Sequence, residues 1–192
     1  SLTIINRNII TRLSEKFDVY VTSLDKYDPQ YKVDTDTIKK IKELEAKDLG
    51  DTNPEIQIRH TYPPLWNWPI SDKTKVVYIQ PWEYPKVPFE WQYKFETFAD
   101  ALIVPSNYVK QIFLDGGLNP SKTFVVPNGY NPKIFNKDKT NVKPMLGVNP
   151  DKFNFLFVGN SQWRKGLDIL INVWHKCFKK YDKCSLIIKD NP

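Results

Sequence analysis

The chain is poor in cysteine, histidine and glycine, and each shortage excludes a class of site. Its 192 residues include two cysteines, two histidines and seven glycines. Cys177 and Cys184 are too few for a disulfide framework. A four-ligand zinc site would need both cysteines together with His60 and His175. We therefore expect neither a disulfide scaffold nor a metal site.

Phosphate-binding glycine motifs and long apolar runs are also missing. Neither G-x-G-x-x-G nor G-x-x-x-x-G-K-[ST] occurs, which excludes the standard dinucleotide fingerprint and the P-loop from these residues. No apolar run approaches the ~18 residues that a membrane span needs, and no basic-then-apolar leader opens the printed sequence. We expect no membrane-spanning segment.

The charge is moderate and spread along the chain. A net charge of +6 arises from 28 basic and 22 acidic residues that are mostly interspersed. A nucleic-acid binder usually gathers its basic residues on one face or arm. The densest clusters, Lys39-Lys40 and Lys179-Lys180, lie in helical patterns, where a solvated face is the simpler interpretation. We therefore expect no nucleic-acid partner.

What the chain has is apolar periodicity in a globular composition, with 41% hydrophobic residues. The pattern predicts helices near 2–13, 34–47, 88–98, 106–115 and 167–181, and strands near 18–22, 56–59, 75–80, 101–104, 123–126, 153–158 and 185–188. Strands 101–104 and 153–158 are continuous apolar runs, typical of strands buried on both faces. Strand, helix and strand in close succession form βαβ units, so the fold class is α/β with parallel sheets.

A change in composition divides the chain. Residues 128–152 are rich in Asn, Lys, Pro and Asp, as linkers are. We expect an N-terminal domain over 1–127, an inter-domain linker over 128–152 and the start of a C-terminal domain over 153–192. The last segment, of about 40 residues, is too short to bury its own sheet. We therefore expect the chain to be a piece of a longer protein.

The loop VGNSQWRKG follows the strand predicted at 153–158. In open α/β sheets, ligands bind beyond the carboxyl ends of the strands. Gly159 permits a tight exit from the strand, and Arg164 and Lys165 stand where the next helix begins. Their charges would join the free N–H groups and the dipole of the helix N-terminus. The loop suits a phosphate or a diphosphate; an ordinary exposed basic pair is the other interpretation.

Six large aromatic side chains fall within 30 residues and alternate with prolines: Trp66, Trp68, Trp82, Tyr84, Trp91 and Tyr93. Such rings can stack on sugars or seal a sheet edge against water, and the pattern favours packing. Glu83 directly follows a strand segment, which points to a cleft rim, although a solvated glutamate is the simpler interpretation. His60 also ends a strand, and a lone histidine is more often structural than catalytic.

Two stretches, VPSNYVKQIFLDGGLNPSKTFVVPNGYNPKIF and FNFLFVGNSQWRKGLDILINVWHKCF, resemble in order and spacing the family-4 type of glycosyltransferases, also called group 1. The resemblance covers residues 101–192 and extends more weakly to RHTYPP, YIQPWEY and the opening helix. It implies a glycosyltransferase-B fold, with two Rossmann-like parallel sheets and flanking helices. Residues 1–127 would be the acceptor-side domain without its first strand, and 153–192 the start of the nucleotide-sugar-binding domain.

The resemblance also implies donor-side roles in this second segment. Lys165 matches the lysine that neutralises the donor diphosphate, and Arg164 stands beside it. Gly159 and Asn160 complete the donor-binding loop, although Asn160 stands where many members have arginine. The pair of glutamates that contacts the donor would lie beyond Pro192, so no catalytic residue is assigned.

On the acceptor side, the resemblance points to a cleft formed by Gln80, Trp82, Glu83 and His60. Gln80 to Glu83 occupies a place where many members carry a histidine, so the chemistry on this side differs from theirs.

The implied function is transfer of a sugar from a nucleoside-diphosphate donor to an acceptor hydroxyl, with retention of configuration, in glycan or cell-surface polysaccharide synthesis. We expect no cofactor and no metal, because fixed cations would stabilise the leaving diphosphate. The expected partners are a nucleotide sugar and a hydroxyl acceptor. We expect a cytoplasmic location, with peripheral membrane contact left open, and little or no activity from these residues alone.

Two other functions are compatible with the residues. One is a non-catalytic carbohydrate- or protein-binding module that uses the aromatic segment 62–93. The other, less favoured, is a single-strand nucleic-acid binder that stacks bases on the same rings.

Overall fold

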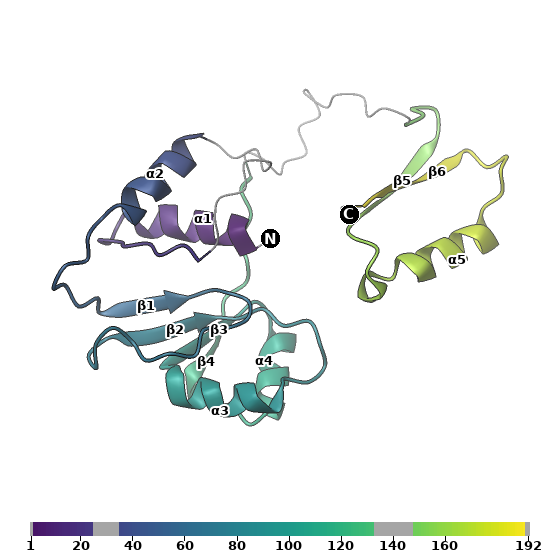
Figure 1. The fold of residues 1–192 in the computed structure, drawn as a ribbon. Coiled ribbons are helices and arrows are strands. Elements are labelled where there is room, and N and C mark those ends of the chain that lie inside the picture. Colours follow the sequence, from purple (N-terminus) through teal and green to yellow (C-terminus); the bar gives the residue numbers. More distant parts are fainter. Residues whose placement is uncertain (1, 25–34, 133–147, 191–192) are drawn as a thin grey trace. The chain divides into compact units, whose positions relative to one another are not determined.

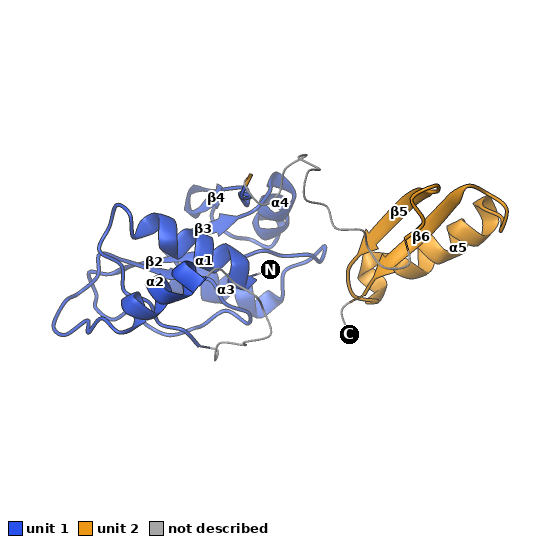
Figure 2. Ribbon diagram, turned by 90° about the horizontal axis from the view of Figure 1, so that it is seen from above, with its two compact units in different colours: residues 1–131 blue, residues 132–192 orange. Residues whose placement is uncertain are grey.

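The computed structural model describes residues 2–24, 35–132 and 148–190. The chain divides into two compact units, Ser1–Asn131 and Pro132–Pro192 (Figure 2). Helices accompany parallel strands in both units, which confirms the predicted α/β class. Most of the predicted linker, residues 133–147, lies outside the described residues. The acceptor-side and nucleotide-binding assignments of the two segments stay predictions.

Unit 1 contains a four-stranded sheet in the order β1-β2-β3-β4, and every neighbouring pair is parallel. The strands are β1 (Ile56–Arg59), β2 (Lys75–Ile79), β3 (Ala101–Val104) and β4 (Thr123–Val125). Figure 1 shows α3 and α4 along one face of this sheet, with α1 and α2 on the side of the other face. Parallel neighbours place the carboxyl ends of all four strands at one edge.

The helices of unit 1 are α1 (Leu2–Leu13), α2 (Thr35–Glu45), α3 (Phe89–Phe98) and α4 (Asn107–Asp115), with a 3₁₀ turn, η1 (Pro120–Lys122). In α4, the Ser106 side chain accepts a hydrogen bond from the Val109 backbone nitrogen at 3.2 Å. Beyond the helix end, Gly117 adopts a φ of 91°, which favours glycine. The predicted cap and stop of this helix are both confirmed.

The core lies between the sheet and the helices α3 and α4. Val76, Tyr78 and Leu102 project from one face of the sheet and are each 1% exposed. They pack with Phe95 from α3 and Phe113 from α4. Complete burial of such a side chain contributes roughly 1.5–3 kcal/mol, so this layer stabilises the unit most strongly.

The other face of the sheet is covered only in part. Ile56 and Phe124 are 57% and 50% exposed, although they alternate along their strands with inward-facing residues. Asp18 to Thr22, predicted as a strand, is not one: the segment pairs with no strand among the residues that the structure describes. Its side chains instead contact Lys47, which binds the Asp18 carboxylate and lies over the Tyr20 ring.

Unit 2 is a single βαβ unit, as predicted. β5 (Phe153–Val158) and β6 (Cys184–Lys189) pair in parallel over their whole length. They are joined by a 3₁₀ turn, η2 (Trp163–Lys165), and by α5 (Leu167–Cys177). The Phe155 ring packs on those of Trp174 and Phe178, at 5.4 and 5.5 Å between centroids, so α5 and the residue after it cover this face.

Two expectations for unit 2 were wrong. The strand at 153–158 is not buried on both faces: Phe153, Leu156 and Val158 are 68%, 56% and 64% exposed. One helix covers one face of a two-stranded sheet, and no second layer is present among the described residues of this unit. The helix also ends at Cys177 instead of reaching Tyr181, because Phe178 turns to an extended conformation.

Candidate functional site

The carboxyl edge of the unit 1 sheet holds the predicted acceptor-side residues. His60 follows β1 and Gln80 follows β2; they are 8% and 1% exposed. The Gln80 backbone nitrogen donates to the Ile103 carbonyl at 2.9 Å, which continues the ladder between β2 and β3. Its side-chain nitrogen donates to the Pro81 carbonyl at 3.0 Å. Gln80 is thus fixed in place at the edge.

His60 is held by a side chain from α1. Its Nδ1 is hydrogen-bonded to Asn6 Oδ1, and its backbone carbonyl accepts from Asn6 Nδ2 at 3.2 Å. Its Nε2 is buried and has no hydrogen-bond partner. Burial lowers the pKa of the imidazole below its ordinary value, so the ring is neutral near pH 7. Sequence reasoning missed Asn6, which lies 54 residues away in the chain.

Trp82 and Glu83 follow Gln80 and differ in exposure. The Trp82 indole donates to the Lys86 carbonyl at 3.0 Å, and its ring packs against Trp91 with 4.7 Å between centroids. Glu83 is exposed, as a residue at a cleft rim would be. Its role in a cleft stays a prediction.

The six aromatic side chains of segment 62–93 divide into two sets. Trp66, Trp82 and Trp91 pack against the core, and the Trp66 ring lies 4.8 Å from that of Phe95. Trp68 and Tyr93 are 70% and 73% exposed, and Tyr84 is 44% exposed. The packed set has fewer free ring faces for a ligand than the exposed set.

Arg59, which sequence reasoning also missed, ties this segment to the sheet. Its buried guanidinium donates to the carbonyls of Leu65, Asn67 and Trp68 at 3.3, 2.7 and 3.3 Å. It also donates to the Tyr78 hydroxyl at 2.9 Å and to Gln57 Oε1 at 3.0 Å. Burial raises the pKa of Tyr78, although the bond from Arg59 opposes the rise. The loop before β2 is therefore anchored through these oxygen atoms.

In unit 2, the predicted donor-side residues lie between β5 and α5. The Gly159 backbone nitrogen donates to the Lys189 carbonyl at 3.0 Å. Asn160 Oδ1 is buried and has no hydrogen-bond partner. Arg164 and Lys165 are exposed in η2, and Arg164 Nε donates to Gln162 Oε1 at 3.1 Å.

Gly166 separates the basic pair from the helix. It adopts a left-handed conformation, with φ 69° and ψ 23°, and no side chain caps α5. The first backbone N–H groups of α5 therefore lack a side-chain acceptor at the cap. In the sequence, lysine followed by glycine before an apolar repeat indicated this turn before the helix. The structure brings together cations, a turn and an uncapped helix start.

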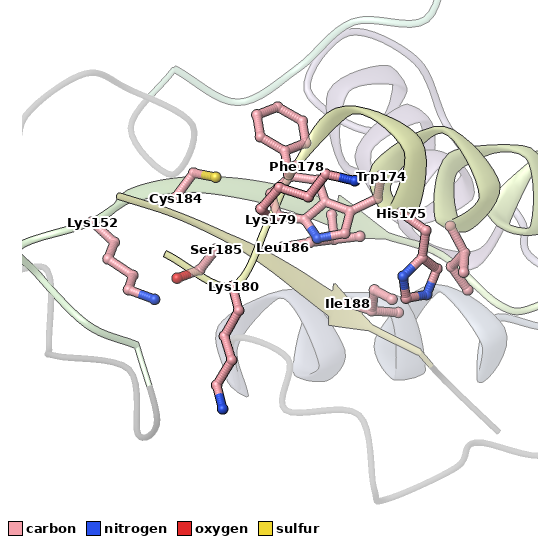
Figure 3. Close-up of a pocket in the computed structure, with 11 residues that line it drawn as sticks. Lys152, Trp174, His175, Phe178, Lys179, Lys180, Cys184, Ser185, Leu186 and Ile188 are labelled. Carbon is pink, nitrogen blue, oxygen red and sulfur yellow. The ribbon is translucent and has the colours of Figure 1, made fainter. Parts of the chain in front are cut away.

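A groove of about 580 Å³ in unit 2 lies elsewhere, between the end of α5 and β6 (Figure 3). Trp174, Phe178 and Leu186 line it together with Lys152 and Lys180. None of the predicted site residues lines this groove.

Within the described ranges 2–24, 35–132 and 148–190, no group of three or more metal-binding side chains is close enough to hold an ion. The helices of these ranges are all too short or too polar to cross a membrane.

Comparison with known proteins supports the resemblance over unit 1. The model of a family described as Glycosyltransferase Family 4 matches residues 54–134. Neither a curated protein nor a solved structure gives a match. The matched segment contains the whole four-stranded sheet, the helices α3 and α4, and the predicted acceptor-side residues His60, Gln80, Trp82 and Glu83. Residues 54–134 of this chain are therefore similar to the family-4 glycosyltransferases.

Proposed function

We propose that the chain is part of an enzyme that transfers a sugar from a nucleoside-diphosphate donor to an acceptor hydroxyl with retention of configuration. The product would be a glycan or a cell-surface polysaccharide. The observation that carries this proposal is the family match over 54–134, a segment whose parallel sheet ends in buried polar side chains at one edge. Ligands of open α/β sheets bind at such edges.

In this proposal the acceptor lies at the carboxyl edge of the unit 1 sheet. His60 and Gln80 supply fixed polar groups from buried positions, and Trp82 and Glu83 follow on the next segment. A neutral imidazole can accept a hydrogen bond from a sugar hydroxyl, and an exposed carboxylate can do the same from the rim. Acceptor recognition would thus combine two buried groups with one exposed group.

The donor diphosphate would bind at the loop that precedes α5. Breaking the glycosidic bond leaves negative charge on the diphosphate, which Arg164 and Lys165 would stabilise together with the uncapped start of α5. Fixed cations of this kind do the work for which other transferases use a metal ion. Both side chains are exposed in unit 2, and solvent weakens their attraction for an anion. We therefore expect weak donor binding and little or no transfer by these 192 residues alone.

Asn160 suits a different part of the donor. Its unpartnered atom is Oδ1, a hydrogen-bond acceptor, which fits a ribose or sugar hydroxyl better than a phosphate oxygen. Rotation of the amide by half a turn would present Nδ2 to a phosphate instead. Asn160→Asp separates the two arrangements, since the added charge would weaken phosphate binding more than hydroxyl binding.

The proposal is tested by isothermal titration calorimetry, in which the chain is titrated with UDP and with GDP. We expect Lys165→Ala to weaken binding about tenfold, the cost of one charged hydrogen bond. Lys176→Ala, at an exposed position in the last turn of α5, is the matched control and should change little. Equal losses of affinity for UDP and GDP in both variants would mean that only the net charge matters for binding. The assigned donor site would then be wrong.

The aromatic module is the weaker alternative. Trp66, Trp82 and Trp91 pack against the core, which leaves Trp68 and Tyr93 as the most exposed of the six predicted rings. Sugar binding that is lost in Trp68→Ala but unaffected in Lys165→Ala would favour that function over the transferase.

A further inference from the structure

The contact between His60 and Asn6 joins two parts of the chain that are 54 residues apart. His60 stands at the carboxyl end of β1, and Asn6 lies within α1. The histidine is 8% exposed, and its Nε2 is among the few buried side-chain atoms without a hydrogen-bond partner in the described ranges. Buried polar atoms nearly always have a partner, so this nitrogen requires an explanation.

The two hydrogen bonds fix the position of the proton on the ring. The His60 carbonyl can only accept, so the Asn6 atom that faces it at 3.2 Å is the donor Nδ2. The other amide atom, Oδ1, then faces His60 Nδ1 and can only accept. In a neutral ring, Nδ1 must carry the proton and Nε2 must be the bare acceptor. Burial keeps the ring neutral, which agrees with this form.

An unprotonated Nε2 calls for an O–H or N–H donor. The described protein supplies none to this atom. Its location at the carboxyl edge of the sheet, one strand away from the buried Gln80, is where a ligand of such a sheet would lie. Sugar hydroxyls are donors of the right kind, and a buried water is the other source of the same chemistry.

We propose that Asn6 is a positioning residue that holds His60 with its proton on Nδ1 and so presents Nε2 to a hydroxyl group of a sugar substrate. The assignment of the hydroxyl to a sugar rests on the proposed transferase function; the role of Asn6 in fixing the ring does not. Because Nε2 has almost no exposed surface, a sugar reaches it only through a local opening.

The first test is ¹⁵N NMR of the histidine rings in the whole chain. We expect the Nδ1-protonated form in the wild type and a mixture of both neutral forms in Asn6→Ala. Asn8→Ala is the matched control, because Asn8 lies on the same helix and its exposed side chain donates to the Ile4 carbonyl at 2.8 Å, within one helical turn. Asn6→Asp loses the donor to the His60 carbonyl but retains an acceptor for Nδ1, and should keep the proton on that nitrogen. An Nε2-protonated wild type would overturn the proposal without any need for a variant.

The second test uses methyl glycosides of glucose, mannose and galactose as probes. We expect at least one of them to move the His60 Nε2 resonance toward that of a hydrogen-bonded nitrogen, and to bind about tenfold more weakly to Asn6→Ala. If the chemical shift of Nε2 is that of a hydrogen-bonded nitrogen without sugar, and none of the probes moves it, the donor is a buried water. The proposed sugar contact is then wrong. UDP and GDP binding is measured separately, so loss of the transferase function and loss of this contact are distinguishable.

Discussion

The two units build the same kind of parallel strand pairing and differ in how well they cover it. In unit 1, β2 and β3 place Val76, Tyr78 and Leu102 under two helices, and each is 1% exposed. In unit 2, β5 carries equally apolar residues, yet Phe153 and Val158 are 68% and 64% exposed. Of the buried hydrophobic residues in the described ranges, only Leu167 belongs to unit 2. Apolar sequence makes a strand, but burial needs a second layer.

The same contrast separates the two candidate sites. His60 and Gln80 are buried and hydrogen-bonded at the edge of a four-stranded sheet. Arg164 and Lys165 are exposed beside a two-stranded one. Fixed groups in a buried site act more strongly than exposed groups, so the candidate site of unit 1 is the better organised of the two.

The largest expected effect is the difference between two identical substitutions. Phe95→Ala empties a fully buried position in unit 1 and should lower the free energy of unfolding by about 3–5 kcal/mol. Phe153→Ala changes a side chain that is 68% exposed in unit 2 and should cost less than about 1 kcal/mol. Urea denaturation followed by tryptophan fluorescence measures both. Similar losses would show that the two sheets are covered equally in solution.

The next effect concerns the buried guanidinium of unit 1. Arg59→Met removes the donor to the carbonyls of Asn67 and Trp68 and to the Tyr78 hydroxyl, and should cost about 3 kcal/mol. Arg12→Met is the control, because that side chain is 80% exposed in α1 and should cost under about 0.5 kcal/mol. Thermal unfolding compares the two, and equal melting temperatures would contradict an anchoring role.

A smaller effect is expected from one of two glycines of unit 2. Gly166→Ala forces a φ of 69° on a residue with a side chain and should destabilise the turn before α5 by about 1 kcal/mol. At Gly159 an added Cβ would meet only the Phe157 ring at 3.5 Å, an ordinary contact, so Gly159→Ala is the control. Amide hydrogen exchange in α5 reports the difference. An equal effect in both variants would mean that backbone conformation does not set the helix start.

The smallest expected effect is a pH dependence confined to unit 1. Burial depresses the pKa of His60 below the ordinary histidine value of 6.5, so below that pH the unfolded chain binds more protons than the folded one. The contribution of neutral His60 to the free energy of unfolding is therefore fully present above pH 6.5, and it is lost as the pH falls toward the folded-state pKa. Urea denaturation across this range should show the loss in the wild type and in His175→Gln. His60→Gln should lack it, and a wild-type slope retained in His60→Gln would assign the effect to another group.

Local features were the most predictable part of this fold. The Ser106 cap, the end of α4 at Gly116-Gly117 and both βαβ units follow from hydrogen bonds and repeats within short stretches. The segment Asp18 to Thr22 alternates like a strand, but a strand also needs a neighbour, which alternation does not reveal. The candidate site residues after β1, β2 and β5 were predictable because strand ends are local features too.

By itself, the sequence predicted the order of helices and strands apart from the segment 18–22, the α/β class and the resemblance of its first sheet to the family-4 glycosyltransferases, since each is encoded in short patterns. Only the tertiary structure decided which strands are buried, that Arg59 anchors the loop before β2, and that Asn6 faces His60. These outcomes depend on contacts between groups that are far apart in the sequence. Contacts of that kind leave no periodic signal in the chain, because they are set by how whole layers pack.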